Sequence, residues 1–131
     1  MTKQILATVM MLMCFAFAKA QLESSQWFFG ENAGVDFRSG NVESTAISQM
    51  QTGEGCATLS DEDGNLLFYT DGSTVYNRNH EIMVNGTGLK GNSSSTSSAV
   101  AVPFPDSTNL FYIFTVDTDD LEYRLTEGMH Y

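Results

Sequence analysis

From Gln21 onward, apolar residues come in short runs that are separated by clusters of Gly, Asn, Asp and Ser. The apolar residues do not recur with the period of about 3.6 residues that an amphipathic helix requires. Short apolar or alternating runs between turn residues are instead typical of antiparallel β-sheets. The sequence therefore predicts an all-β fold, with strands at Gln26–Phe29, Val35–Phe37, Cys56–Ser60, Leu66–Thr70, Thr74–Tyr76, Ser98–Val102, Leu110–Thr115 and Leu121–Leu125.

Two segments between these runs predict β-hairpins. Asp61-Glu62-Asp63-Gly64-Asn65 is a turn sequence in which Gly64 is free to adopt a positive φ, so Cys56–Thr70 is expected to form a hairpin. The segment from Pro103 to Asn109 joins a second pair of strands in the same way.

The two hairpins belong to a weak internal repeat. Leu67-Phe68-Tyr69 recurs 43 residues later as Leu110-Phe111-Tyr112, and Ala57-Thr58-Leu59 aligns with Val100-Ala101-Val102 at the same offset. Trp27-Phe28-Phe29 offers an earlier copy. Repeats of about 40–45 residues built from short strands are typical of β-propeller blades. A propeller needs about four to eight blades, so we expect about two to three blades of an incomplete region, and hence a fragment of a longer protein. A free-standing small β-sandwich is the alternative fold.

The first twenty residues have the organisation of a cleavable signal peptide. Lys3 is followed by an apolar run from Ile5 to Ala18, and Ala18-Lys19-Ala20 supplies a small-x-small cleavage pattern. The run is shorter than the roughly twenty residues of a membrane-spanning helix, and no second apolar run follows. The sequence therefore predicts a signal peptide at 1–20 that is cleaved near Ala20, and a secreted or surface-held domain at 21–131 with no transmembrane segment.

Charge and cysteine content restrict the partners and the chemistry. Removing residues 1–20 removes two lysines and no acidic residue, which changes the formal net charge from −10 to −12. Such an acidic chain repels nucleic acid, so no nucleic-acid partner is expected. Cys56 is the sole cysteine of the mature chain and stands in an apolar strand, which excludes an intrachain disulfide and favours a small buried side chain.

Candidate metal ligands are weak. The acidic segment 61–65 resembles a calcium loop, but Gly64 stands at the fourth position rather than the sixth and no bidentate Glu follows. A second acidic cluster, Asp117-Thr118-Asp119-Asp120 with Glu122, fits a solvated turn. His80 and His130 lack partners at zinc-ligand spacing. We therefore predict no metal or cofactor and retain calcium as a minor possibility.

The sequence also contains residues of the kinds that carbohydrate-active enzymes use. Asp36, Asp71 and Asp117 stand near strand ends, where catalytic carboxylates often lie. Three aromatic residues are candidates for stacking on sugars: Trp27, Tyr69 and Tyr76. Turn aspartates and core aromatics account for the same residues, so no catalytic, cofactor-binding or metal-binding residue is assigned.

Several motifs together resemble one family. They are Gly30-Glu31-Asn32-Ala33-Gly34-Val35-Asp36-Phe37, Glu54-Gly55-Cys56-Ala57, Gly64-Asn65-Leu66-Leu67-Phe68-Tyr69-Thr70-Asp71-Gly72, Val75-Tyr76-Asn77-Arg78-Asn79-His80 and Asn85-Gly86-Thr87-Gly88-Leu89. The set is similar to the N-terminal region of large Bacteroidetes surface proteins that are exported by the type IX, gliding-associated secretion system.

This resemblance implies a propeller-like N-terminal region followed by immunoglobulin-like repeats and a C-terminal sorting domain, through which the export machinery would bind the whole protein. Asp106-Ser107-Thr108 also resembles a short O-glycosylation motif of these bacteria. The chain departs from the pattern at two positions, since Val84 replaces a frequent Pro and Asn92 a frequent His.

Two functions follow as expectations. The leading one is a secreted or cell-surface, non-enzymatic propeller-like module for adhesion, gliding-related surface display or binding of surface glycans or proteins. The alternative is part of a secreted carbohydrate-active enzyme with a glycoside hydrolase-like propeller. Whether the chain is an enzyme stays open, with the absence of a recognisable catalytic constellation favouring the first.

Overall fold

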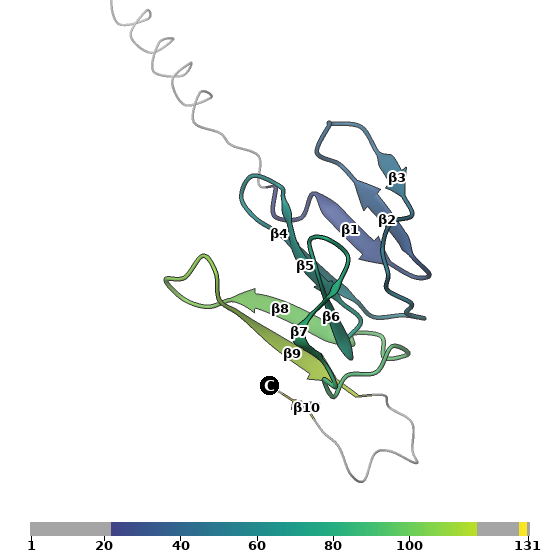
Figure 1. The fold of residues 1–131 in the computed structure, drawn as a ribbon, viewed down its shortest axis with the longest axis vertical. Helices are drawn as coiled ribbons and strands as arrows, with labels where there is room; N and C mark the ends of the chain where they lie inside the picture. The colour runs from purple at the N-terminus through teal and green to yellow at the C-terminus, as the bar shows by residue number, and fades with distance from the viewer. Residues whose placement is uncertain (1–21, 118–128, 131) are drawn as a thin grey trace, which may run out of the picture.

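The fold is known from a computed structural model that describes residues 22–117 and 129–130. The described residues form three antiparallel sheets and contain no helix, as the all-β prediction requires (Figure 1). The predicted signal peptide and the predicted strand Leu121–Leu125 lie outside the described residues.

Each sheet is built from strands that follow one another in the chain. The first has the order β1 (Gln26–Phe29), β2 (Ala33–Asp36) and β3 (Glu43–Thr45). The second has the order β4 (Ala57–Ser60), β5 (Leu66–Thr70), β6 (Thr74–Asn77) and β7 (Ile82–Thr87). In the third, β9 (Phe111–Val116) lies between β8 (Ala99–Pro103) and β10 (Met129–His130).

The two predicted hairpins are present. β4 pairs with β5 across the turn at Asp61–Asn65, in which Gly64 has a φ of 82°. β8 pairs with β9, and Asp106 in the connecting turn has a φ of 59°. Asp71 holds the next turn, because its Oδ1 accepts hydrogen bonds from the backbone N–H groups of Ser73 (2.8 Å) and Thr74 (2.7 Å).

The sheet β4–β7 lies between the other two, and adjacent residues of β5 connect it to each neighbour. Tyr69 is fully buried and packs on Phe28 of β1, with ring centroids 4.9 Å apart. Phe68 points to the opposite face and meets Phe111 of β9 edge-to-face at 5.5 Å. Successive side chains of a strand point to opposite faces, so β5 contributes to both inter-sheet contacts. The core cluster is Phe28, Met50, Leu66 and Tyr69.

The internal repeat is present as a repeat of hairpins, but the predicted residue alignment is wrong. An offset of 43 residues aligns Phe68 with Phe111. These two side chains face each other across two sheets, so they do not occupy equivalent positions. The register also differs, because Thr58 pairs with Tyr69 whereas its counterpart Ala101 pairs with Ile113. A shift of one residue in the strand pairing moves every side chain to the opposite face of the sheet. The sequence alignment at an offset of 43 residues therefore differs from the structural alignment by one residue.

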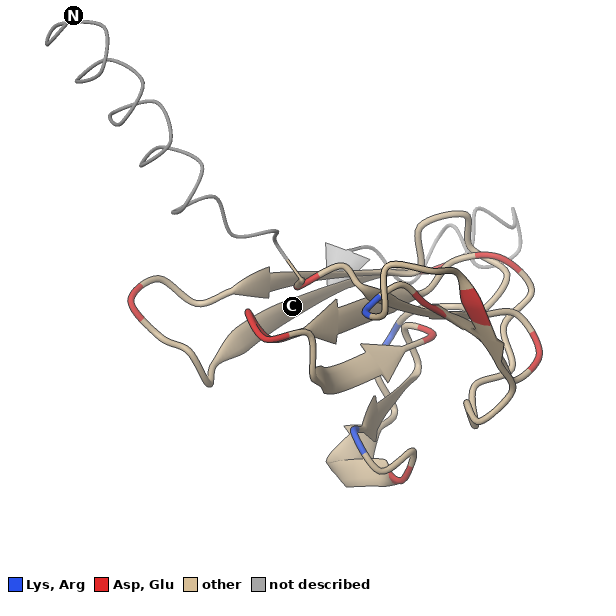
Figure 2. Cartoon of the chain, turned by 90° about the horizontal axis from the view of Figure 1, so that it is seen from above, with Lys and Arg blue, Asp and Glu red and all other residues tan. Residues whose placement is uncertain are grey.

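The described residues close neither a barrel nor a propeller. They also include no helix with the length and apolar character needed to cross a membrane. Acidic residues are spread over turns and strand ends rather than gathered on one face (Figure 2).

Candidate functional site

The candidate site is a groove between the sheet β4–β7 and the hairpin β8–β9. It consists of two adjoining cavities with volumes of about 380 Å³ and 440 Å³. The two cavities share five of their lining residues, which are Leu67, Arg78, Thr108, Asn109 and Phe111. Volumes of this order are typical of pockets that hold small ligands.

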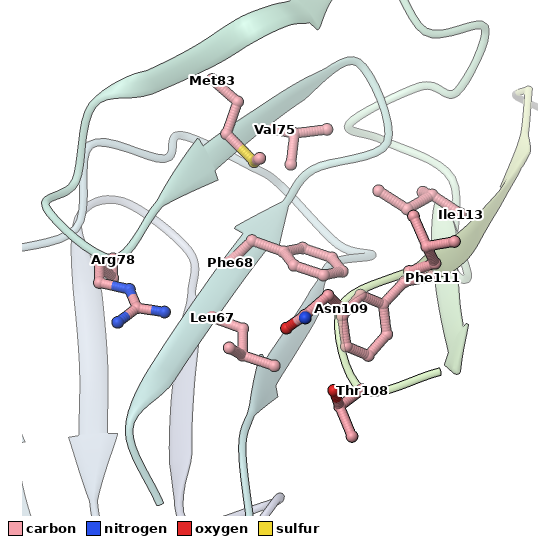
Figure 3. A pocket seen from close by; sticks show the side chains of 10 residues that line it. Leu67, Phe68, Val75, Arg78, Met83, Thr108, Asn109, Phe111 and Ile113 are labelled. Carbon is pink, nitrogen blue, oxygen red and sulfur yellow. The ribbon is translucent and has the colours of Figure 1, made fainter. Parts of the chain in front are cut away.

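The smaller cavity has an apolar floor. Phe68 and Val75 come from β5 and β6, and Phe111 and Ile113 come from β9 (Figure 3). Met83 of β7 lies beside Val75, and Arg78 stands at one end of the floor (Figure 3). Phe68 and Phe111 meet edge-to-face in this floor, with ring centroids 5.5 Å apart.

The larger cavity has a polar rim. The hairpin turn contributes the carboxylates of Asp61, Glu62 and Asp63, while Arg78 and Asn109 supply hydrogen-bond donors. The groove thus presents donors and acceptors within one cavity, above the apolar side chains of its floor.

Within the rim, Asp61 is fixed by its own turn. Its Oδ1 accepts hydrogen bonds from the N–H groups of Asp63 (3.0 Å) and Asn65 (2.8 Å), and its Oδ2 accepts one from Asn65 Nδ2 (3.0 Å). The hydrogen bond from the Asn65 side chain, with a smaller effect of the charge on Arg78, lowers the pKa of Asp61 below its usual value. The carboxylate is therefore ionised and committed to the turn, as expected for a hairpin.

No metal site is assembled in the part of the chain that the structure describes. No group of three or more His, Cys, Asp and Glu side chains converges there. Most of the second acidic cluster, from Thr118 to Asp120 together with Glu122, lies outside the described residues, as does the side chain of His130.

His80 lies in an aromatic cluster that the sequence did not predict. Its Nδ1 is 3.2 Å from the hydroxyl of Tyr69, which also accepts a hydrogen bond from Gln49 N–H at 3.0 Å. A tyrosine hydroxyl both donates and accepts, so it can donate to Nδ1 of neutral His80 while it accepts from Gln49 N–H. The His80 ring also meets Phe28 edge-to-face at 5.4 Å, and burial lowers the pKa of the imidazole. His80 therefore has a structural role, in contact with the core residues Phe28 and Tyr69.

Two of the candidate catalytic carboxylates, Asp36 and Asp71, are occupied by structural contacts. Asp36 forms an ion pair with Arg38, which lowers the pKa of the carboxyl group mainly through the side-chain hydrogen bonds. Asp71 is buried and caps a turn. Neither residue lines the groove. Both carboxylates therefore have structural roles outside the groove.

The candidate sugar-stacking aromatic residues differ in how far their side chains are buried. Tyr69 is fully buried, and Tyr76 stacks on it at 5.0 Å, so Tyr69 is excluded as a surface platform. Trp27 is 52% exposed and meets Phe37 at 5.2 Å. Cys56 is half-buried against the core, and burial raises the pKa of its thiol, which disfavours the thiolate.

Sequence reasoning missed Arg78 and Asn109, whose neighbours in the chain resemble ordinary turns. The groove forms only when β6 and the turn after Pro103 meet in space. No local pattern could have indicated this.

Comparison of the chain with protein-family models, with curated proteins and with solved structures gives no match.

Proposed function

We propose that this chain is a secreted or cell-surface module that binds a ligand, with surface glycans as the ligand class, and performs no chemistry on it. The groove is the observation that carries the proposal. Each sugar hydroxyl is both a donor and an acceptor, and the groove offers carboxylates beside Arg78 and Asn109. The apolar faces of a sugar ring match the floor formed by Phe68, Phe111 and their neighbours.

The proposed architecture is part of a β-propeller. The sheet β4–β7 is a four-stranded meander, which is the form of a propeller blade. Its first strand, β4, contacts both β1 and β8, so neighbouring sheets meet through their early strands. The resemblance to exported, gliding-associated surface proteins adds the cell surface as the place of action and the type IX machinery as the export partner of the whole protein.

A glycan array probed with the full chain tests this function. We expect saturable binding to a defined group of glycans, with no release of reducing ends when those glycans are incubated with the chain. Absence of binding to every glycan on the array would contradict the proposal.

The second candidate is part of a carbohydrate-active enzyme. The observation in its favour is the acidic rim, because Asp61, Glu62 and Asp63 line the same cavity as the apolar floor residue Phe111. Hydrolysis of glycosides requires two carboxylates about 5–10 Å apart on either side of the bond. Release of reducing ends by the full chain, lost in the Glu62→Gln or Asp63→Asn variant, would establish this second function and reject the first.

A further inference from the structure

The three sheets form a stack whose two end faces are apolar. At one end, a face of the hairpin β8–β9 points away from the sheet β4–β7. Val100 pairs with Phe114 and Val102 with Tyr112, so these four side chains share this face. Aromatic contacts extend along it, from Phe104 to Tyr112 at 5.3 Å and from Tyr112 to Phe114 at 5.9 Å.

Among the residues that the structure describes, no charged side chain lies on this end face. Its members are Val100, Val102, Phe104, Tyr112, Phe114 and Val116, and all of these except Phe114 are between 39% and 52% exposed. Together they present roughly 400 Å² of surface, within the range of the largest apolar patch on a typical monomer. We call this surface the β8–β9 face.

The other end of the stack has a face of the same kind. Phe28 points inward to Tyr69, so Trp27 and Phe29 point outward, and they are 52% and 39% exposed. Trp27 pairs with Val35 of β2 and contacts the ring of Phe37. These four outward residues form the β1–β2 face.

The contacts inside the stack show what such faces accommodate. At both inner junctions an aromatic side chain of β5 meets an aromatic side chain of the next sheet, Tyr69 on Phe28 and Phe68 on Phe111. Each end face presents aromatic and branched apolar side chains of the same sort. A further antiparallel sheet therefore fits either end by the packing that already joins the three sheets.

We propose that copies of this chain associate head to tail, with the β8–β9 face of one copy packed on the β1–β2 face of the next. Pairing two identical faces would leave the other apolar face of each copy exposed, whereas head-to-tail pairing covers both. A heterologous contact of this kind forms a ring when the rotation closes. Two faces of roughly 400 Å² would bury at most roughly 800 Å² together, which is the size of a weak, transient interface. The inference rests on the propeller-like stacking in the proposed function and adds a second copy as the partner.

Sedimentation velocity on the full chain without its signal peptide tests the assembly. We expect a mass of two or more copies at micromolar concentration. Tyr112→Glu disrupts the β8–β9 face and Trp27→Glu the β1–β2 face, so each variant alone should sediment as a monomer. A mixture of the two should form a one-to-one dimer, because one intact face of each kind remains.

Val84→Glu is the matched control, since Val84 is 94% exposed and belongs to neither face. It should assemble like the wild type. Val102→Lys and Phe29→Lys replace the first pair if circular dichroism shows that Tyr112→Glu or Trp27→Glu fails to fold.

A wild-type monomer throughout the concentration range would overturn the proposal, as would a Trp27→Glu variant that still dimerises by itself. Both outcomes are read without any ligand, so they are distinct from a failure to bind glycans.

Discussion

Tyr69 belongs to the core cluster and contacts its neighbours through both its ring and its hydroxyl. The ring packs between Phe28 and Tyr76, and the hydroxyl contacts Gln49 N–H and His80 Nδ1. The residue belongs to a strand whose apolar pattern is evident in the sequence, but its hydroxyl partners come from loops on either side. The sequence therefore predicted that strand aromatics fill the core and gave no indication of the hydrogen bonds.

Removing the hydroxyl tests this arrangement. Tyr69→Phe removes the hydroxyl that contacts Gln49 N–H and His80 Nδ1, and a typical intramolecular hydrogen bond contributes about 0.5–1.5 kcal/mol net. We expect the free energy of unfolding in urea at pH 7 to fall by that amount. Tyr112→Phe, at an exposed tyrosine, is the control and should change it little. An equal loss in both variants would contradict the role given to the Tyr69 hydroxyl.

His80 should make stability depend on pH. Burial lowers its pKa below the ordinary value of 6.5, so the unfolded chain binds the proton more readily than the folded chain. The stability contributed by neutral His80 is therefore complete above pH 6.5 and declines as the pH falls through 6.5 toward the folded-state pKa. Urea midpoints measured between pH 7.5 and pH 5 check this decline.

His80→Asn is the matched variant, because the residue has a φ of 63° and Asn tolerates that conformation. It should reduce the loss of stability between pH 7 and pH 5. An unchanged pH dependence would assign the loss to other groups.

At the level of elements, strands were predicted correctly where the sequence contains a run of apolar residues. The predicted bounds match β1 and β5, where apolar residues dominate, and differ by one or two residues for β2, β4, β6, β8 and β9. β3 was missed because Glu43-Ser44-Thr45 contains no apolar residue. β7 was missed because it carries a register irregularity opposite β6, with Asn85 at a φ of 59°.

The junction between the second and third sheets depends on a close approach of backbones. Gly72 has a φ of 88°, and a Cβ there would lie 2.7 Å from the carbonyl oxygen of Ser98. Gly88 has a similar φ of 79° but no neighbour within 4 Å. Gly88→Ala should thus cost only the left-handed conformation, about 1–2 kcal/mol.

Gly72→Ala should cost more than Gly88→Ala, because it adds a clash with backbone that has little freedom to move. Thermal unfolding of the two variants provides the comparison. Equal melting temperatures would show that the approach of Ser98 contributes nothing to the junction.

For the whole molecule, the sequence predicted the class of fold but not the site. The groove combines a hairpin turn, β5, β6, β7 and a second hairpin, and it depends on the face to which each strand turns. The 43-residue repeat placed Phe68 and Phe111 on equivalent faces, although they face each other across the groove. When a strand alignment is wrong by one residue, every side chain is assigned to the wrong face of its sheet. The residues that line a cavity between two sheets then cannot be identified from the sequence.

Calorimetric titration of a glycan selected on the array tests most directly whether the groove binds the ligand. Arg78→Ala removes the cation that lines both cavities, whereas Arg38→Ala removes an exposed arginine that lines neither. Each variant loses one positive charge, so a general electrostatic effect would appear in both. We expect the affinity to fall at least about tenfold in Arg78→Ala, since a hydrogen bond to a charged group contributes about 1.5–3 kcal/mol, and to be retained in Arg38→Ala. Unchanged affinity in Arg78→Ala, or an equal loss in both variants, would contradict ligand binding in the groove.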